Sequence, residues 1–320
     1  MFPGQGSQSV GMGRRLAEAS PSAASVLAEA DAIIGAPLSM LAFDGPAEEL
    51  DQTVNAQPAI LAVSIAMLAS LRESWAATRT EIAPAFVAGH SMGQYSAMVA
   101  AGALTLPDAL RLVRERGRLM QASGNRDGAM AAVMGLGDAE IALAVEAGSA
   151  HGQVGVANRN APGQTVLSGA RVAVQAAMER ARQLGARRVV LLPVSVAAHS
   201  PLMAEAAAGM QRVLEDVTFR APDPALFANA DGCPIESAAA ARSELVSHLT
   251  TGVDWVTVIE RMAAAGVDTF VEVGPGRVLT GLIKRIVPDA TAIAVDAPEA
   301  GGVAQAAIEL ASPRGVPATT

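Results

Sequence analysis

The sequence predicts an α/β protein with a mainly parallel sheet and a small inserted domain, and three observations support this prediction. Short apolar segments with the composition of buried strands alternate with longer helical segments along most of the 320 residues. Between residues 123 and 197 the segments follow the order β-α-β-β-α-β, which is typical of ferredoxin-like folds. A serine flanked by two glycines also lies where one apolar segment passes into a helix.

The N-terminal part of the chain is predicted to be mainly helical. It begins with a glycine-rich loop at residues 2–8, which can bring backbone N–H groups and two amide side chains close to a ligand. Apolar residues at helical spacing then predict several helices, the first of them interrupted at Pro21. Helices are expected at residues 11–35, 55–75, 96–101 and from 105 onward, with a buried strand at residues 85–88.

A small inserted domain is predicted because the pattern changes after Gly128. Strands are expected at residues 129–136, 153–158, 164–169 and 188–194, and helices at residues 138–147 and 172–184. We therefore divide the chain into an inserted domain of residues 123–197 and a large domain formed by residues 1–122 and 198–320.

After the insertion the alternation of helices and strands returns, which implies that a parallel sheet is covered on both faces. Helices are expected at residues 201–217, 236–249, 255–265 and 278–286, and strands at residues 225–228, 269–273 and 291–295.

The composition limits the classes of partner and cofactor. A formal net charge of -8 argues against nucleic acid or an anionic membrane surface as the main partner. The lone cysteine, Cys233, excludes a disulfide framework and a cysteine-ligated metal site. The longest stretches without charged residues, 52–71 and 86–107, contain polar residues and are not predicted to span a membrane. The N-terminus has no export signal, so we expect a cytoplasmic monomer without a bound metal.

Ser91 is the candidate nucleophile because it occupies the centre of a Gly-x-Ser-x-Gly turn, although an ordinary tight turn gives the same five residues. A serine nucleophile needs a base, and the chain has four histidines. His90 should point away from the serine oxygen, His151 lies on a predicted loop, and His248 lies near a predicted helix end. His199 follows a strand at the return to the large domain and is our choice. No acid is placed to orient it, so a backbone group is expected in that role.

Arg116 is predicted to lie on the apolar side of its helix, where an unpaired guanidinium is costly. It can reach the protein surface or pair with an internal carboxylate. Alternatively, its planar fork can bind the carboxylate of a substrate through two hydrogen bonds. The sequence leaves these interpretations open.

Taken together, the motifs resemble the malonyl-CoA:acyl carrier protein transacylases, and their order and approximate spacing match over nearly the whole chain. The matching segments are residues 2–8, 89–93, 116–121 and 158–169, His199, and residues 273–279. The resemblance implies an α/β-hydrolase-like large domain with a ferredoxin-like insertion. It also implies transfer of a malonyl group from malonyl-CoA, as substrate, to the phosphopantetheine thiol of an acyl carrier protein, without a cofactor, for fatty acid or polyketide synthesis.

The resemblance also implies roles for individual residues. Ser91 would carry the malonyl group, and His199 would act as base and then as acid. The backbone N–H groups of Met92 and Gln5 would form the oxyanion hole, and Arg116 would bind the malonyl carboxylate. The remaining substrate-binding positions that the resemblance implies are Asn158, Gln164 and His90.

The chain departs from the family pattern at four places. The first strand is expected to be short or missing, because only Met1 precedes Phe2. Gln94 stands where glutamate is commoner, and His248 replaces a glutamine whose main-chain carbonyl is thought to orient the catalytic histidine. Residues 196–199 differ from the tetrapeptides associated with extender choice in modular polyketide acyltransferases.

Three other functions are compatible with parts of this pattern. They are an editing acyl-thioester hydrolase, the malonyl transferase subunit of a malonate decarboxylase, and a module that docks a carrier protein without catalysis. Because carrier proteins are typically acidic, docking would need a local basic patch on this acidic chain. The candidates for that patch are Arg182, Arg187, Arg188, Lys284 and Arg285.

Overall fold

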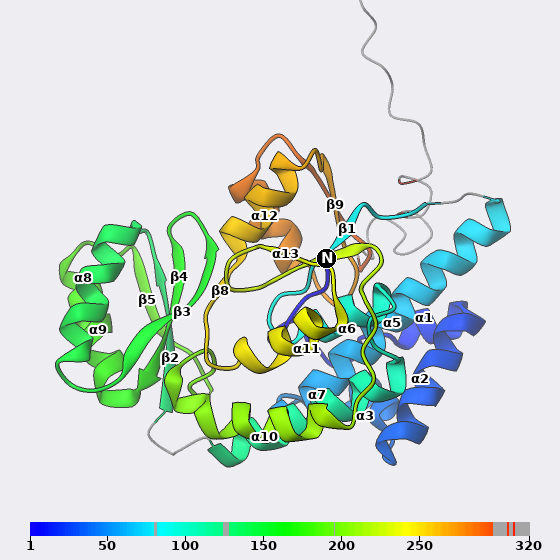
Figure 1. The fold of residues 1–320 in the computed structure, drawn as a ribbon, viewed down its shortest axis with the longest axis horizontal. Coiled ribbons are helices and arrows are strands. Elements are labelled where there is room, and N and C mark those ends of the chain that lie inside the picture. Colours follow the sequence, from blue (N-terminus) through cyan, green and yellow to red (C-terminus); the bar gives the residue numbers. More distant parts are fainter. Residues whose placement is uncertain (80–81, 124–127, 195, 297–305, 307–309, 311–320) are drawn as a thin grey trace, which may run out of the picture.

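The structure, a computed structural model, describes residues 1–79, 82–123, 128–194, 196–296, 306 and 310. It is a mixed α/β molecule (Figure 1) in which a unit containing the helices α8 and α9 lies at one end and the N-terminal helices lie at the other. The predicted helices and strands are present, and their bounds differ by a few residues from those expected.

The predicted first helix is divided at Ser20 into α1 (Arg14–Ala19) and α2 (Pro21–Ile34). The Ser20 hydroxyl accepts a hydrogen bond from the backbone N–H of Ala23, so the break is a helix cap followed by proline. Two short helices that the sequence analysis did not identify follow, α3 (Leu38–Asp44) and α4 (Ala47–Leu50). They are too short to show a helical period.

The long apolar helix α5 (Thr53–Thr78) is the centre of the main hydrophobic core. By length and composition α5 could cross a membrane, but 78% of its apolar window is buried inside the protein. Such a helix is part of a folded core, as expected of residues 52–71.

Parallel strands form the centre of the large part of the molecule, but they are very short. The strand β1 (Phe86–Val87) pairs parallel with β6 (Ala225–Phe227), and β7 (Pro234–Ile235) pairs antiparallel with β6. A separate parallel pair consists of β9 (Thr269–Glu272) and β10 (Thr291–Ala294). The parallel pairing was predicted, whereas its division between two short sheets was not.

The N-terminal residues connect these two sheets. The backbone N–H of Phe2 donates to the oxygen of Ala88 at 2.9 Å, and Phe2 forms a parallel bridge with Gly89. On the other side, the N–H of Val273 donates to the oxygen of Met1 at 2.8 Å. The first strand is therefore as short as expected, and it places the glycine-rich loop beside the serine turn.

The unit at the other end has a five-stranded sheet in the order β5-β2-β4-β3-β8. Its pairs β5–β2, β2–β4 and β4–β3 are antiparallel, whereas β3 and β8 are parallel. The helices α8 and α9 pack on it, as Figure 1 shows in green. The elements are β2 (Gly128–Met134), α8 (Asp138–Ser149), β3 (Val154–Ala161), β4 (Gln164–Ala170), α9 (Arg171–Gln183), β5 (Arg188–Leu191) and β8 (Val253–Asp254). The edge strand β8 comes from a later part of the chain and was not predicted, because two residues show no alternation.

The remaining helices surround the short parallel strands. The predicted helix at residues 201–217 begins as a 3-10 turn and is shorter than expected. The described elements are α6 (Gly93–Ala100), α7 (Leu106–Ser123), η1 (Pro201–Met203), α10 (Ala204–Glu215), α11 (Ala238–Ser247), α12 (Trp255–Ala264) and α13 (Val278–Ile286).

Candidate active site

Ser91 lies on a tight turn between β1 and α6, and its backbone adopts φ 52°. For a residue with a side chain, this left-handed conformation costs roughly 1–2 kcal/mol. The two flanking glycines are required by close packing, because a Cβ on Gly89 would lie 2.0 Å from the carbonyl carbon of Gly93. A Cβ on Gly93 would lie 2.2 Å from the oxygen of Phe2. The turn therefore has the strained geometry of a nucleophile elbow.

His199 faces the serine across the site. Its Nε2 lies 2.8 Å from the Oγ of Ser91, and its Nδ1 lies 2.6 Å from the carbonyl oxygen of His248. The carbonyl oxygen of Thr251 lies 3.1 Å from the same Nδ1. Because a carbonyl only accepts, Nδ1 carries the proton, and Nε2 is left to accept the proton of the serine hydroxyl. Backbone oxygens orient this histidine, as the sequence analysis expected.

The His199 imidazole is held in its neutral form. Burial and, to a smaller extent, the positive charge of Arg116 together lower the pKa of His199 to about 3, while the bond to His248 opposes both effects. The imidazole is therefore unprotonated near neutral pH and available as a base.

His248 contributes its main chain to the site, while its side chain is fully buried behind His199. Its ring centroid lies 6.2 Å from that of His199 and 5.9 Å from that of Tyr95. Burial lowers the pKa of His248 well below its usual value, and the charges of Arg116 and His199 act in the same direction. The residue that departs from the family pattern is therefore also neutral, and it orients His199 through an atom that every residue has.

The side chain of Arg116 comes from α7 and also contacts the serine. Although the residue is only 2% exposed, its Nη2 donates to the Oγ of Ser91 at 3.2 Å and its Nη1 donates to the Oε1 of Gln57 at 2.7 Å. Among the described residues, no carboxylate forms an ion pair with it. A buried guanidinium that lies beside the serine hydroxyl without an anionic partner can bind a negatively charged group.

The backbone around the serine can form an oxyanion hole. The N–H of Ser91 itself is occupied, because it donates to the Oδ1 of Asn229 at 2.8 Å. Within the described part of the chain, the N–H groups of Met92 and Gln5 donate to no protein acceptor. These two groups are therefore available to a ligand oxygen.

The other predicted substrate-binding residues are not brought into contact with the catalytic groups. The Nε2 of His90 lies 2.8 Å from the Oδ1 of Asn160, and burial lowers the pKa of His90. Asn158 is buried on β3. Gln164 accepts a hydrogen bond from Arg285 on α13. The contact between His90 and Asn160 connects the turn at Ser91 to β3, a strand of the five-stranded sheet.

Sequence reasoning missed the polar residues that support the site from behind. Gln57 binds Arg116, and Asn229 binds the turn at Ser91. Asn229 lies two residues after the end of the parallel strand β6, which is a usual position for functional polar side chains and could have identified it. Gln57 lies within an apolar helix, where its sequence context gives no comparable signal.

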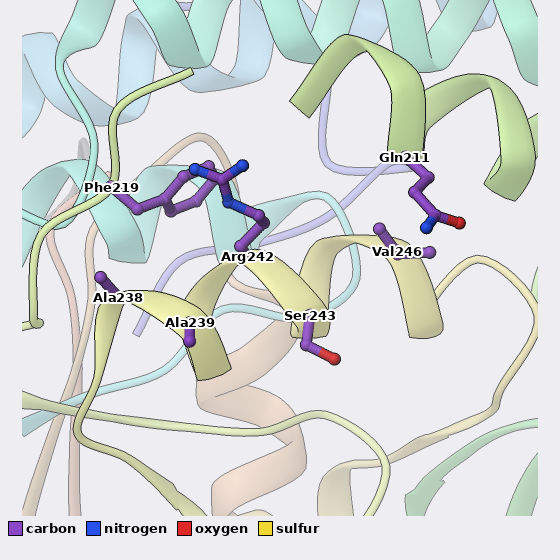
Figure 2. A pocket seen from close by; sticks show the side chains of 7 residues that line it. All are labelled: Gln211, Phe219, Ala238, Ala239, Arg242, Ser243 and Val246. Atoms are coloured by element: carbon purple, nitrogen blue, oxygen red, sulfur yellow. The ribbon is translucent and has the colours of Figure 1, made fainter. Parts of the chain in front are cut away.

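A cleft of about 520 Å³ lies elsewhere, between α10 and α11 (Figure 2). It contains neither Ser91, His199 nor Arg116. The lining residues are Gln211, Phe219, Ala238, Ala239, Arg242, Ser243 and Val246. In the described part of the chain, no group of three or more His, Cys, Asp or Glu side chains could hold a metal ion.

Comparisons with known proteins agree with this geometry. The model of the acyl transferase domain family matches residues 1–301. The malonyl CoA-acyl carrier protein transacylase of Escherichia coli (strain K12) is 44% identical over 301 residues, covering 94% of this chain and 96% of that protein. The crystal structure of an acyl-carrier-protein-S-malonyltransferase from Bartonella henselae has a TM-score of 0.90 at 41% identity, with 97% of each chain covered. A malonyl-transacylase solved in complex with a type II polyketide acyl-carrier protein has a TM-score of 0.88 at 41% identity, with 92% of this chain and 94% of that chain covered.

Proposed function

This chain belongs to the malonyl-CoA:acyl carrier protein transacylases of the acyl transferase domain family, and on that premise we propose that Ser91, His199 and Arg116 perform its reaction. The protein transfers a malonyl group from malonyl-CoA to the phosphopantetheine thiol of an acyl carrier protein. It supplies malonyl units for fatty acid or polyketide synthesis.

The first half of the reaction loads the serine. His199 Nε2 accepts the proton of the Ser91 hydroxyl while Oγ forms a bond to the thioester carbon of malonyl-CoA. The resulting oxyanion accepts hydrogen bonds from the N–H groups of Met92 and Gln5. When the carbon–sulfur bond breaks, the protonated His199 gives its proton to the departing sulfur, leaving a malonyl ester on Ser91.

The second half runs the same steps in the opposite direction. The thiol of the phosphopantetheine arm gives its proton to His199 as its sulfur attacks the ester carbon. The bond to Ser91 then breaks, and His199 returns the proton to Oγ. The same two N–H groups serve both tetrahedral states.

Arg116 selects the acyl group through the free carboxylate of malonate. The observation that carries the proposal is the position of its guanidinium, 3.2 Å from the nucleophilic oxygen and without an anionic partner among the described residues. A malonyl group on Ser91 would present its carboxylate to this fork and replace the contact with Oγ. The bound carboxylate would also neutralise the charge that lowers the pKa of His199, so the proper substrate makes the base stronger.

Labelling of Ser91 tests this assignment. We expect intact-mass analysis after mixing with malonyl-CoA to show one malonyl adduct on the wild type and none on Ser91→Ala. We expect Arg116→Ala to lose malonyl labelling by at least about a hundredfold and to gain relative labelling by acetyl-CoA, since a buried ion pair is lost. The matched control is Arg118→Ala, which removes an exposed arginine two residues further along α7. An adduct on Ser91→Ala, or unchanged acyl preference in Arg116→Ala, would refute the assignment.

We also propose that residues 123–197 form an inserted ferredoxin-like domain and that residues 1–122 and 198–320 form an α/β-hydrolase-like domain. The order β5-β2-β4-β3 and the separate hydrophobic clusters of that unit support this division. Since the substrate is a coenzyme A thioester, we place the reaction in the cytoplasm.

The acyl carrier protein is proposed to dock on the exposed face of α13. Lys284 and Arg285 both lie on that face, near the helix end. The loop before α13 packs on the glycine-rich loop, because a Cβ on Gly274 would lie 2.5 Å from the ring of Pro3. A carrier protein bound there would stand close to the proposed oxyanion hole.

A further inference from the structure

Glu244 is a buried carboxylate that the reaction described above does not use. It lies on the last turns of α11 and is 7% exposed. Its Oε1 accepts hydrogen bonds from the backbone N–H of Asn229 at 2.8 Å and from the Nε2 of Gln94 at 3.1 Å. Within the described residues no basic side chain forms an ion pair with it. Such a group is costly to bury and needs an explanation.

The two residues that Glu244 holds are those that hold the serine turn. The side chain of Gln94 accepts from the N–H of Gly89 at 3.0 Å, and the side chain of Asn229 donates to the oxygen of Gly89 at 3.0 Å. The Oδ1 of Asn229 accepts from the N–H of Ser91 at 2.8 Å. Gln94 and Asn229 are almost completely buried. Two amide side chains therefore hold the backbone at Gly89 and Ser91, and one carboxylate oxygen accepts from the side chain of Gln94 and from the backbone N–H of Asn229.

This support matters because the turn is strained. The left-handed backbone of Ser91 persists only if the surrounding contacts fix it. A small rotation of this turn would move Oγ away from Nε2 of His199, and displacements of about 1 Å can lower a rate about a hundredfold. The hydrogen bond to Asn229 also keeps the N–H of Ser91 occupied, which leaves that of Met92 for the oxyanion.

The same turn of α11 also supports the base. His248, four residues after Glu244, supplies the carbonyl oxygen that binds Nδ1 of His199 at 2.6 Å. The N–H of His248 donates to the oxygen of Glu244 at 3.0 Å, so the two residues share one helical hydrogen bond. One turn of one helix thus reaches the nucleophile through a side chain and the base through the main chain.

We propose that Glu244 is a positioning residue for Ser91, acting through Gln94 and Asn229 without touching the substrate. This proposal rests on the proposed role of Ser91. Removing the carboxylate would leave the N–H of Asn229 and one N–H of Gln94 without an acceptor in a buried region, so both amides would rearrange. Burial raises the pKa of Glu244, while the bonds from Asn229 and Gln94 oppose this shift. Both bonds end on the one acceptor atom Oε1, so an uncharged carbonyl oxygen at this position can accept the same bonds.

The test compares Glu244→Gln, Glu244→Asp and Glu244→Ala by the rate constant of Ser91 malonylation at saturating malonyl-CoA and by KM. We expect Glu244→Ala to be acylated at least about tenfold more slowly than the wild type, with KM within about twofold of the wild-type value. The reason is that the geometry at Ser91 changes, whereas the binding of the malonyl carboxylate by Arg116 does not. Glu244→Gln should restore the rate to within about threefold, since it keeps an acceptor oxygen. Glu244→Asp, which draws the oxygens back by one methylene, should lie between them.

Asp31→Ala is the matched control, because Asp31 on α2 also accepts a backbone N–H and a hydroxyl, both from Ser39, on a helix that supplies none of the site residues. It should lose stability while keeping the wild-type rate. A Glu244→Ala rate equal to wild type, or a Glu244→Gln rate as low as that of Glu244→Ala, overturns the proposal. If Glu244→Ala does not fold, an undiminished rate in Glu244→Asp overturns it. Failure of the wild type to label would refute the proposed function instead.

Discussion

At the scale of single residues, backbone strain occurs at two of the residues that are proposed to react. Arg79, Ser91 and His199 are the non-glycine residues with positive φ in the described part of the chain, and two of them form the Ser–His pair. Their backbone conformations cost free energy that the surrounding contacts must supply. The buried side chains of Gln94 and Asn229 accept hydrogen bonds from the backbone of the turn at Ser91. The N–H of His199 donates to the oxygen of Leu249 at 3.1 Å.

The pH dependence of acylation should report the charge of Arg116. The pKa of His199 is lowered to about 3 by burial and by Arg116, so the base stays unprotonated as the pH falls until that value is approached. In Arg116→Ala one of the causes that lower this pKa is removed, and the acidic limb of kcat/KM should move to higher pH. Acetyl-CoA is the substrate to use, because it has no carboxyl group that titrates in this range.

The measurement is the kcat/KM of Ser91 acetylation between about pH 3 and pH 7, started by pH jump and stopped within one turnover. Arg118→Ala serves again as control and should keep the wild-type limb. Coinciding limbs in wild type and Arg116→Ala would mean that His199 does not feel the guanidinium.

The residues proposed to react could be predicted from the sequence, whereas the residues that hold them in place could not. Ser91, His199 and Arg116 were selected because a glycine-flanked serine, a histidine after a strand and an arginine on an apolar helix face are each unusual. The structure brings them within hydrogen-bonding distance. Asn229 holds the backbone of the turn at Ser91, and Glu244 holds Asn229 and Gln94. Which of these groups lie near one another depends on the tertiary fold.

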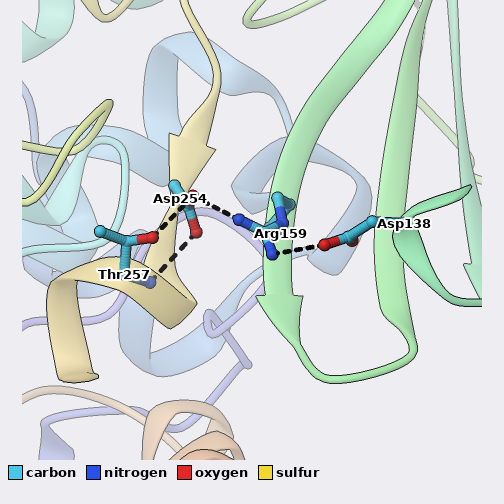
Figure 3. A network of polar contacts seen from close by, with 4 residues as sticks. All are labelled: Asp138, Arg159, Asp254 and Thr257. Atoms are coloured by element: carbon cyan, nitrogen blue, oxygen red, sulfur yellow. Dashed lines mark hydrogen bonds and ion pairs between the residues drawn. The ribbon is translucent and has the colours of Figure 1, made fainter. Parts of the chain in front are cut away.

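At the scale of elements, β3 connects the unit that contains α8 and α9 to the rest of the molecule. Arg159 on β3 donates to Asp254 at 2.6 Å and to Asp138 at 2.8 Å (Figure 3). Asp254 also caps α12, since its carboxylate accepts from the N–H of Thr257 at 3.1 Å and from its hydroxyl at 2.8 Å. The next residue, Asn160, makes the contact with His90 on the serine turn. The carboxylate of Asp254 therefore both caps α12 and forms an ion pair with Arg159.

The cap should contribute more to stability than the ion pair. We expect Asp254→Ala to lower the free energy of unfolding by about 1–2 kcal/mol, as for other helix N-caps. Asp254→Asn keeps a capping oxygen and should cost less than about 0.5 kcal/mol, and the same holds for Asp138→Asn, since partly exposed pairs contribute little. Urea unfolding of the three variants measures this. Equal losses in Asp254→Asn and Asp254→Ala would show that the charge is what matters.

The elements that the sequence analysis missed share one property. The helices α3 and α4 have seven and four residues, and the strands β7 and β8 have two each. No period can be read from so few residues, and what makes them regular is the partner that the fold supplies. The longer elements, such as α5 and β4, were found because their burial pattern repeats along the sequence.

At the scale of the whole molecule, charge is distributed unevenly. The chain has a formal net charge of -8, yet α13 contains Lys284 and Arg285 and no acidic residue. Of the five basic residues considered for docking, Arg182 pairs with Glu179 on its own helix. A positive patch on a negative protein directs an acidic partner to one place and repels it elsewhere.

Reversing the charge of Lys284 should therefore weaken the use of carrier protein selectively. We expect Lys284→Glu to raise the KM for an acyl carrier protein several-fold at low salt, with the KM for malonyl-CoA and the rate of Ser91 loading unchanged. Arg15→Glu, on the exposed side of α1, changes the net charge equally and should leave all three values unchanged. The difference should shrink as salt is added. Equal effects of both variants would place the docking surface elsewhere.

The double support from α11 has a mechanical consequence. Because Glu244 and His248 lie one turn apart, a displacement of α11 moves the anchors of nucleophile and base in the same direction. Because the shift is common to both anchors, it largely cancels in the distance between Ser91 and His199. We therefore expect the distance between Ser91 Oγ and His199 Nε2 to change less than the position of α11 itself.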